Sequence, residues 1–580
     1  MLYPLFFAAV YLSHLTLLRL PYFWDEAGYY IPAAWDFFRT GTLIPVTTLT
    51  NAHPPLPSIL LAVWWHLSGF VPSATRTFIC MVSATALLAI YRLARCLLGI
   101  HAAIATTLLT ALYPVWFAQS TLAHADIFAA AFTLWALSFY LESVNAVAVS
   151  ATPCFAPLSH TSSVPPRPAY AALLATAVLF SLAALSKETA IVTPVALALW
   201  EALLFLRDRA IQSLRREHIG WLAALLSPIL PLAAWYAYHF HRTGFIFGNP
   251  EYLRYNATAN LDAHRIALCL YHRLLHLTLH MNLFVPVLCA AATLLLLPVI
   301  ATRARLPRPV LAAIAVVLLA NWAAFSILGG ALLTRYLLPM YPLVLLLCVA
   351  QWQVRVRRWY LLAAFSAAAF LCGLWINPPY AFAPEDNLTY RNYIILHQRA
   401  VALIAQKWPQ ATVLTAWPAT SELERPELGY TKRPIKAFAI QNFSFDELEE
   451  AANDPGDYDT ALLFSTKWAP PPGAIDLAPG NSKADARYFD FHQDVLPAEA
   501  AAILHGDLVW QAAIGGEWVA VLRFPRIENA SAVYLNSRQR ISSRQTTRSS
   551  CATSSRITDC ESVPIDTVQP PNLGLTGRRL

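Results

Sequence analysis

Residues 310–328 read VLAAIAVVLLANWAAFSIL, with no charged side chain, and Arg303, Arg305 and Arg308 precede them. An α-helix needs roughly 17 to 25 apolar residues to cross the hydrocarbon core of a bilayer, so this stretch predicts a membrane-spanning helix. The whole chain of 580 residues has the same character. Of its residues, 57% are hydrophobic and only 13% are charged, whereas an ordinary globular domain is about one quarter charged. We therefore expect the bilayer to be the main solvent of this protein.

Apolar runs of similar length recur along the chain and predict about eleven membrane spans. The first run has neither the basic flank nor the small-residue cleavage site of a signal peptide, so we expect it to form a span. The runs cover residues 3–20, 73–95, 100–118, 122–143, 169–186, 188–206, 219–240, 281–300, 310–328, 332–350 and 359–376.

Arginines occupy every second gap between these runs. Cytoplasmic loops of membrane proteins are enriched in Lys and Arg, so the alternation predicts a cytoplasmic N-terminus and puts residues 377 onward outside. The net charge of +7 therefore reflects membrane topology, and no nucleic-acid partner is expected. The arginines of the basic gaps are Arg92, Arg95, Arg167, Arg207, Arg209, Arg215, Arg216, Arg303, Arg305, Arg308, Arg355, Arg357 and Arg358.

From residue 377 the composition is that of a soluble protein. A helical pattern at 390–408, strands at 412–416 and 460–464, and a hairpin at 507–524 that turns at Gly515-Gly516 predict a small α/β domain. No cysteine lies between residues 373 and 550, so we expect this domain to fold without a disulfide. The last fifty residues are rich in Ser, Arg and Thr with almost no apolar periodicity, which indicates disorder.

The expected fold is therefore an α-helical polytopic membrane protein of about eleven transmembrane helices with a C-terminal extracytoplasmic α/β domain. Its parts are a transmembrane domain at 1–376 with a first outer loop at 21–72, the α/β domain at 377–530, and a disordered tail at 531–580.

Three connecting segments are long enough to have structure of their own. The first outer loop is expected to hold an interfacial helix at 27–38 and, after the Pro-rich stretch 51–57, an amphipathic run that reaches Gly69. Residues 241–280 are polar, which indicates a juxtamembrane loop that either covers a cavity or is a solvated connector. Residues 145–168, rich in Pro, Ser and Thr, predict a flexible cytoplasmic linker.

The first outer loop contains the sequence YFWDEAGYY at residues 22–30, where Asp25 and Glu26 are surrounded by aromatic side chains. The aromatic residues alone indicate the membrane interface. Partial burial raises the pKa of a carboxyl group and makes it a better proton acceptor, so the acidic pair is a candidate general base. The alternative is that Asp25 caps the helix expected at 27–38.

Further polar residues are expected at the outer ends of the spans. Ionisable groups at membrane depth cost roughly 2.5 to 3.5 kcal/mol each on insertion scales, so a group of them favours a lined cavity. Two acidic positions suit proton abstraction and acceptor orientation, and cations suit a phosphate group. The combination fits transfer of a sugar from a lipid-linked phosphate donor. These residues are His53, His124, Asp126, Lys187, Glu188 and Arg335.

Five short elements, in this order, resemble the polytopic C-type glycosyltransferases, a superfamily that includes protein O-mannosyltransferases and bacterial lipid A aminoarabinose transferases. The resemblance extends over residues 1–376. The elements are Asp25-Glu26, His53-Pro54-Pro55-Leu56, Ala123-His124-Ala125-Asp126, Ser186-Lys187-Glu188-Thr189 and Arg335-Tyr336-Leu337-Leu338-Pro339.

This resemblance implies an inverting hexosyl or pentosyl transferase that uses a polyprenyl-phosphate sugar. Asp25 would match the catalytic acidic residue of the family's first loop, Glu26 would support it, and Asp126 would match a second acidic position on the acceptor side. Lys187 and Arg335 would hold the donor phosphate. Three further residues of these elements would contact the donor phosphate or the acceptor: His124, Glu188 and Tyr336.

One departure from the family pattern concerns the sugar. The aminoarabinose transferases have a Glu-Lys pair before the two prolines, whereas this chain has Ala52-His53. Their sugar and lipid A specificity is therefore not carried over, and His53 becomes a candidate phosphate contact whose charge depends on pH.

The expected partners are a polyprenyl-phosphate sugar donor, the lipid bilayer, and an extracytoplasmic acceptor that is a protein, a lipid or a glycan. The residue set implies no cofactor; a divalent metal is compatible with it but not required. The resemblance and the absence of disulfides favour a bacterial inner membrane with a periplasmic active site.

Two other functions use the same features. A transporter or flippase for lipid-linked sugars is disfavoured by the nearly uncharged mid-span positions, and a membrane scaffold has no use for charges at outer helix ends.

Overall fold

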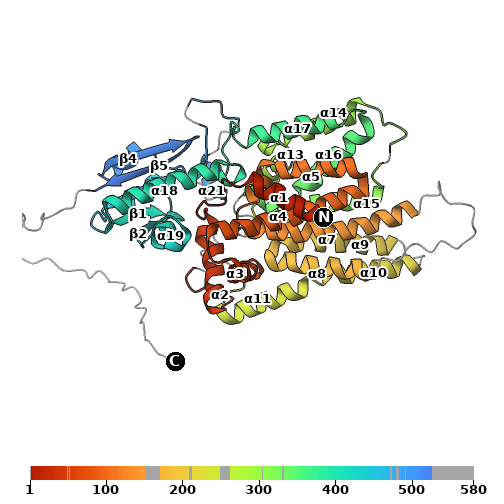
Figure 1. Ribbon diagram of the computed structural model, residues 1–580, viewed down its shortest axis with the longest axis horizontal. Coiled ribbons are helices and arrows are strands. Elements are labelled where there is room, and N and C mark those ends of the chain that lie inside the picture. The colour runs from red at the N-terminus through yellow and green to blue at the C-terminus, as the bar shows by residue number, and fades with distance from the viewer. Residues whose placement is uncertain are drawn as a thin grey trace, which may run out of the picture. The chain divides into compact units, whose positions relative to one another are not determined.

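The computed structural model describes residues 2–48, 50, 52–150, 170–207, 212–247, 261–303, 305–328, 332–470, 473–477, 482–489 and 492–524. Helices dominate residues 2–373, and a five-stranded sheet follows them in the chain (Figure 1). The predicted tail at 531–580 and most of the predicted linker at 145–168 lie outside the described residues. The described start of that linker, to residue 150, continues a helix.

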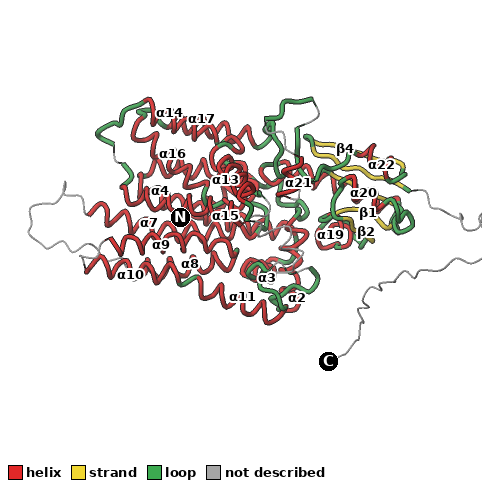
Figure 2. Tube along the Cα trace, turned by 180° about the vertical axis from the view of Figure 1, so that it is seen from behind, coloured by secondary structure: helices red, strands yellow, loops and turns green. Residues whose placement is uncertain are grey.

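The helical part consists of apolar helices packed side by side (Figures 1 and 2), whose interior is built from small and branched side chains of several helices. Its principal helices are α1 Leu2–Ser13, α4 Pro72–Leu98, α5 Ile100–Leu112, α6 Pro114–Gln119, α7 Ala125–Ser150, α8 Tyr170–Ser186, α9 Val192–Arg207, α10 Gln212–Leu226, α11 Ile229–Thr243, α13 Ala263–Thr278, α14 Phe284–Leu296, α15 Arg308–Leu328, α16 Tyr341–Arg355 and α17 Tyr360–Gly373.

Five described helices are long and apolar enough to cross a membrane: Pro72–Leu98, Ala125–Ala148, Glu188–Arg207, Arg216–Thr243 and Arg308–Leu328. A sixth span results if Ala263–Asn282 and Phe284–Leu296, which meet at 101°, are counted as one. The remaining apolar helices are 10 to 17 residues long. They include α1, α5, α8 and α17, which coincide with predicted spans, so the predicted number of about eleven spans stays a prediction.

The prediction that 241–280 is a loop is wrong for its described second half, which forms helix α13. Asp262 caps this helix, because its side chain accepts hydrogen bonds from the backbone N–H groups of His264 and Arg265. Two basic residues of α13, Arg265 and Arg273, are buried inside the protein, whereas His264 is exposed. A helix with buried basic side chains has the same polar composition as a solvated loop, so the sequence did not distinguish the two.

Residues 21–72, the predicted first outer loop, contain the expected helical segments. A π-helical turn, Glu26–Tyr30, leads directly into α2 Ile31–Thr40. After the prolines, α3 Leu56–Ser68 ends at Gly69, as the amphipathic run predicted. Asp25 lies at the N-cap position of the π-helical turn but makes no side-chain capping bond there. The capping interpretation of Asp25 is therefore not supported, and its carboxylate is directed elsewhere.

The region predicted as the C-terminal domain contains a mixed sheet with the order β2-β1-β3-β5-β4, next to helix α18 Thr389–Lys407. Strands β1, β2 and β3 are parallel, and β5 is antiparallel to both β3 and β4. The predicted helix, the two predicted strands and the hairpin are confirmed. Short helices connect them: α19 Ala419–Glu424, α20 Phe445–Ala451, α21 Ser482–Phe489 and α22 Pro497–Ile503. The strands are β1 Thr412–Ala416, β2 Lys436–Ile440, β3 Thr460–Phe464, β4 Asp507–Ile514 and β5 Glu517–Arg523.

Candidate active site

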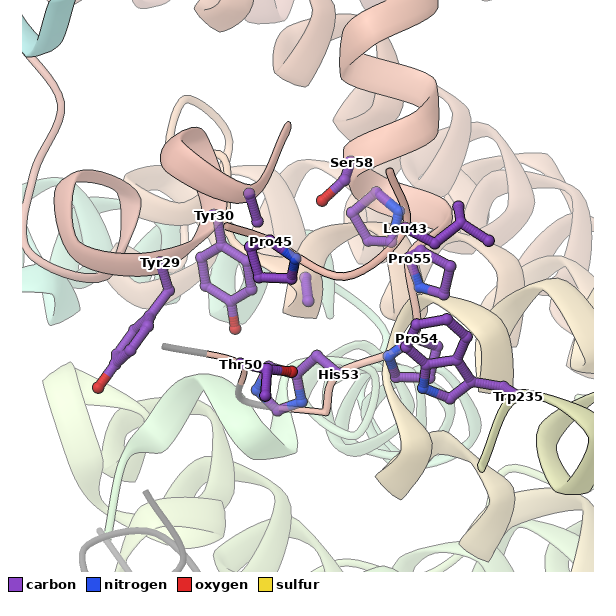
Figure 3. A pocket seen from close by; sticks show the side chains of 13 residues that line it. Tyr29, Tyr30, Leu43, Pro45, Thr50, His53, Pro54, Pro55, Ser58 and Trp235 are labelled. Atoms are coloured by element: carbon purple, nitrogen blue, oxygen red, sulfur yellow. The ribbon is translucent and has the colours of Figure 1, made fainter. Parts of the chain in front are cut away.

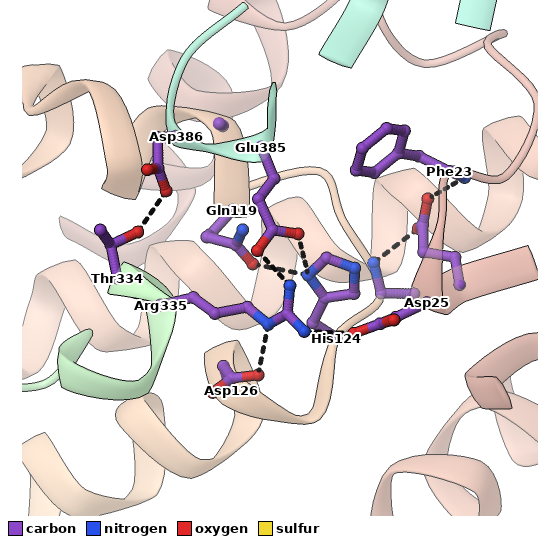
Figure 4. A network of polar contacts seen from close by, with 12 residues as sticks. Phe23, Asp25, Gln119, His124, Asp126, Thr334, Arg335, Glu385 and Asp386 are labelled. Carbon is purple, nitrogen blue, oxygen red and sulfur yellow. Dashed lines mark hydrogen bonds and ion pairs between the residues drawn. The ribbon is translucent and has the colours of Figure 1, made fainter. Parts of the chain in front are cut away.

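Arg335 is the centre of a buried ion cluster at the ends of several helices (Figure 4). It lies in the 3-10 turn Thr334–Leu337, and only 3% of its side chain is exposed. Nη1 of its guanidinium group donates to Glu385, Nη2 donates to Asp25, and Nε lies 3.3 Å from Oδ2 of Asp126. Three carboxylates from distant parts of the chain thus surround one cation.

Lys187 adds a second cation to this cluster. Its Nζ donates to Oδ1 of Asp126 at 2.6 Å, and it lies 4.0 Å from the ring centre of Tyr336. Asp126 therefore links Lys187 and Arg335. The structure brings together the predicted residues Asp25, Asp126, Lys187, Arg335 and Tyr336.

Glu385 was not predicted from the sequence. It lies in the short turn Pro384–Asp386 after α17, and burial raises its pKa to about 8 although Arg335 acts in the opposite direction. The neighbouring Asp386 contacts Thr334 and lies 2.9 Å from Nε2 of His280. A signal was present in the sequence, since Glu385-Asp386 is an adjacent acidic pair that follows the last apolar run, as Asp25-Glu26 follows the first.

Glu26 faces away from the cluster. It is fully buried, and its carboxylate accepts hydrogen bonds from the backbone N–H groups of Phe23 (2.8 Å) and Ala123 (2.6 Å). Arg76 of α4 pairs with it at 3.2 Å, and burial raises its pKa against these interactions. Arg76, which sequence reasoning missed, also donates to the backbone carbonyls of Leu20, Pro21 and Thr121. This geometry suits a carboxylate that fastens the first loop to the bundle.

Asp25 is the more accessible member of the acidic pair. Its side chain is 16% exposed, against 2% for Asp126 and 3% for Glu385, so it is the carboxylate of the cluster most open to a substrate. The residue before it, Trp24, has a backbone φ of 42°, in the left-handed region that non-glycine residues seldom adopt. Strained backbone of this kind tends to occur at functional sites.

His124 borders the cluster without forming a close bond to it. Its Nδ1 lies 2.9 Å from Oε1 of Gln119 and 4.0 Å from Oε2 of Glu385. Its Nε2 is buried and has no hydrogen-bond partner among the described residues. Such an atom indicates a position where a polar ligand or water can bind.

His53 and Glu188 form a separate pair, with 2.8 Å between Nδ1 and Oε2. Tyr30 lies between the pair and the cluster, since its ring is stacked 6.0 Å from that of His53 and lies 5.8 Å from that of His124. His53 and Tyr30 line a pocket together with Tyr29, Thr50, Pro54, Pro55 and Trp235 (Figure 3). Its volume of about 30 Å³ is enough for water but too small for a sugar.

A second small cavity, of about 20 Å³, is lined by residues of α7 and by both cations. Its lining includes Oδ2 of Asp126 and Nε of Arg335, which face each other at 3.3 Å, and Oγ1 of Thr133, which has no hydrogen-bond partner within the described chain. Asn321 and Thr193, which bond to each other at 3.0 Å, complete the polar part of this lining. The cavity thus offers polar contacts beside both cations.

Among the residues that the structure describes, no group of three or more His, Cys, Asp or Glu side chains could hold a metal ion. In the ion cluster, the two cations Lys187 and Arg335 face three carboxylates.

Comparison with known proteins gives a partial sequence match and a similar fold. Residues 52–152 match the sequence model of dolichyl-phosphate-mannose-protein mannosyltransferases. The structure is similar to that of ArnT from Cupriavidus metallidurans bound to undecaprenyl phosphate, with a TM-score of 0.51 and 14% identity over 90% of this chain and 98% of that one. The resemblance to the polytopic C-type glycosyltransferases is confirmed. This chain shares their fold.

Two further structures are similar at lower scores. The apo state of the same ArnT has a TM-score of 0.48 and 14% identity, covering 90% of this chain and 97% of that one. The oligosaccharyltransferase AglB from Archaeoglobus fulgidus, in complex with an inhibitory peptide and a dolichol-phosphate, has a TM-score of 0.43 and 11% identity, covering 80% and 69%. No curated protein sequence matched the chain.

Within this C-type fold, the site residues come from segments that the sequence separates widely. Asp25 follows α1, Asp126 begins α7, Lys187 follows α8, and Arg335 precedes α16. The fold brings these helix ends together.

Proposed function

We propose that the protein transfers a hexosyl or pentosyl unit from a polyprenyl-phosphate donor to an extracytoplasmic protein, lipid or glycan, with inversion at the anomeric carbon. The observation that carries this proposal is the bond between Asp25, the most exposed carboxylate of the cluster, and Arg335, with Lys187 close by. The candidate base Asp25 thus contacts one candidate phosphate-binding cation, Arg335, directly. The second cation, Lys187, is linked to Arg335 through Asp126.

Lys187 and Arg335 would bind the donor phosphate. Hydrogen bonds between cationic side chains and phosphate oxygens are among the strong ones in proteins, and the planar Arg group can form two in parallel. Asp126 contacts both cations, which supports a role in holding them at a fixed distance from each other. A phosphate that reaches Nη1 of Arg335 must compete with Glu385 for it.

Asp25 would act as the general base. It would take the proton from an acceptor hydroxyl as that oxygen attacks the anomeric carbon. The bond between this carbon and the phosphate oxygen breaks in the same step, and the polyprenyl phosphate leaves with both electrons of that bond. A single displacement inverts the configuration of the sugar, and Lys187 and Arg335 would stabilise the charge that develops on the leaving group.

The remaining predicted residues would shape the substrate sites. His53 and Glu188, with the rings of Tyr29 and Tyr30, offer polar and aromatic contacts suited to a sugar or an acceptor. His124 offers its unpartnered Nε2, and Tyr336 covers Lys187. Glu26 would support Asp25 by fastening the loop rather than by touching substrate.

The arginine pattern supports an active site on the outer side of a bacterial inner membrane, with the α/β domain, residues 377–530, also outside. Lipid-linked donors keep their tails in the bilayer, so a site at helix ends suits them.

The test is transfer by the purified full-length protein in liposomes. The donors are undecaprenyl phosphate carrying labelled mannose, glucose, galactose or arabinose, and the acceptors are fractions of the cell envelope. We expect label to move from the carrier into one fraction, and Lys187→Ala to lower the rate by about 10²- to 10³-fold, as loss of one charge-stabilising donor does. Lys436→Ala, in exposed strand β2, is the matched control.

Two results would contradict the proposed function. Label that stays on the carrier with every donor and fraction would exclude transfer among these substrates. Label that crosses the bilayer while still attached to its carrier would favour a flippase.

A further inference from the structure

The loop that carries Asp25 is held by aromatic residues of the C-terminal domain. The ring of Trp24 lies 5.6 Å from that of Tyr393 and 5.7 Å from that of Trp417, and both pairs are edge-to-face. Phe464 approaches the same indole at 6.3 Å. Edge-to-face packing at these distances is the favourable arrangement for aromatic rings.

The sheet topology explains why these residues meet the loop. Trp417 directly follows β1, and Phe464 ends β3. These two strands are parallel neighbours, so their carboxyl ends lie at the same edge of the sheet. The first loop packs against this edge, which is the usual place for functional contacts in sheets with parallel strands.

Gly28 fits closely beneath Trp417. A Cβ atom at position 28 would lie 2.2 Å from Cζ2 of Trp417, far inside van der Waals contact. The backbone of Gly28 is not in the left-handed region, so the close approach of the indole, rather than the backbone conformation, requires glycine. Tyr29 also contacts Trp417, at 5.3 Å between ring centres.

The residues before Asp25 are fixed to the same domain. The backbone N–H of Tyr22 donates to the carbonyl of Leu428 at 3.3 Å, and the hydroxyl of Tyr430 donates to the carbonyl of Tyr22 at 2.9 Å. The loop is therefore held at Tyr22, Trp24 and Gly28. Asp25 lies between these points, directly after the strained backbone of Trp24.

We propose that Trp417, with Tyr393, Phe464 and Tyr430, forms an aromatic clamp that positions Asp25 against Arg335. Trp417 is a positioning residue, because it touches the loop and not the ion cluster. The C-terminal domain is then an integral part of the active site. The catalytic consequence of the clamp rests on the proposed function, whereas the ordering of the loop does not.

The clamp acts on Asp25 and leaves the two cations in place, because Lys187 and Arg335 belong to turns of the helical bundle. Loosening it should therefore lower kcat and leave the KM for the donor nearly unchanged. Misplacing a catalytic group by about 1 Å can lower a rate about 10²-fold, so we expect a decrease of about 10- to 100-fold for Trp417→Ala.

The experiment compares Gly28→Ala, Trp417→Ala and the double variant in the full-length protein. Trp408→Ala is the control, since this half-buried indole of the same domain has its ring contacts at Lys407 and Arg523. Two quantities are measured: hydrogen exchange of the peptide 22–30, and transfer from undecaprenyl-phosphate sugars. We expect faster exchange and slower transfer in both single variants but not in Trp408→Ala.

The double variant is the decisive one. With the indole removed, a methyl group at position 28 has space, so Gly28→Ala should have little further effect in the Trp417→Ala background. Equal damage by Gly28→Ala in both backgrounds, or unchanged exchange of 22–30 in Trp417→Ala, would overturn the clamp. If the wild-type protein transfers no sugar, the proposed function fails while hydrogen exchange still decides the clamp.

Discussion

Replacing Arg335 by Gln removes the cation that three carboxylates share, two of them buried and Asp25 partly exposed. The pKa of Glu385 is raised to about 8, so at pH 7 this residue is largely neutral. Asp25 and Asp126 then balance Lys187 and Arg335, and the cluster has no net charge. In Arg335→Gln the pair between Lys187 and Asp126 remains, but Asp25 has lost its partner, and the cluster carries one uncompensated negative charge.

The loss of folding stability can be estimated from measurements on buried ion pairs in other proteins. Removing one partner of a buried ion pair costs about 3 to 5 kcal/mol, because a charge stays behind without compensation. Typical proteins are stable by only about 5 to 15 kcal/mol, so Arg335→Gln should strongly destabilise the fold around the site. The stability of Arg335→Lys should lie between that of Arg335→Gln and that of the wild type, because one ammonium group cannot reach three carboxylates that lie in different directions.

The assay is thermal unfolding of the detergent-solubilised full-length protein at pH 7. A second variant makes the reasoning specific: Arg335→Gln combined with Asp25→Asn removes the uncompensated charge and should recover a large part of the lost stability. If Arg335→Gln were as stable as wild type, or if Asp25→Asn gave no recovery, the charge balance described for this cluster would be incorrect.

Two further predictions concern single carboxylates, those of Glu385 and Glu26. Because burial raises the pKa of Glu385 to about 8, its carboxylate ionises above that pH and then competes with the donor phosphodiester for Arg335. Binding of undecaprenyl-phosphate mannose should weaken between pH 7 and pH 9, by about tenfold for one competing interaction of about 1.4 kcal/mol, and Glu385→Gln should flatten this dependence. Binding that is equally pH-dependent in both proteins would contradict this role. Glu26→Gln loses the charge that faces Arg76 and should lower thermal stability while leaving donor affinity unchanged; a selective loss of donor affinity would instead indicate a substrate contact.

Local patterns predicted the elements of the fold well where packing follows sequence periodicity. Strands β1 and β3 are buried along most of their length, and their apolar runs were recognised with correct ends. Strand β2 was missed because it is an edge strand that pairs only with β1, and its residues are mostly half-exposed. Its pattern is too weak to recognise alone.

Several members of the ion cluster were named from the sequence, and others were not. Residues in recognisable motifs, such as Asp25 and Arg335, were found, although 310 positions separate them. Glu385 and Arg76 belong to no such motif, and their importance comes only from partners that the tertiary fold supplies. The sequence also did not show that Asp25 and Glu26, which are neighbours in the chain, have different partners, Arg335 and Arg76.

The role of Asp25 as the general base is tested most directly by the Asp25→Asn variant. Its rate of transfer from undecaprenyl-phosphate sugars is measured together with its donor binding. Asn keeps the size of the side chain but cannot accept the proton, so the rate should fall by about 10²- to 10⁴-fold while donor binding persists. Asp36→Asn is the control, because this carboxylate of the same loop accepts bonds from Val46 and Thr47 and lies outside the cluster. Undiminished transfer by Asp25→Asn would show that Asp25 is not the base.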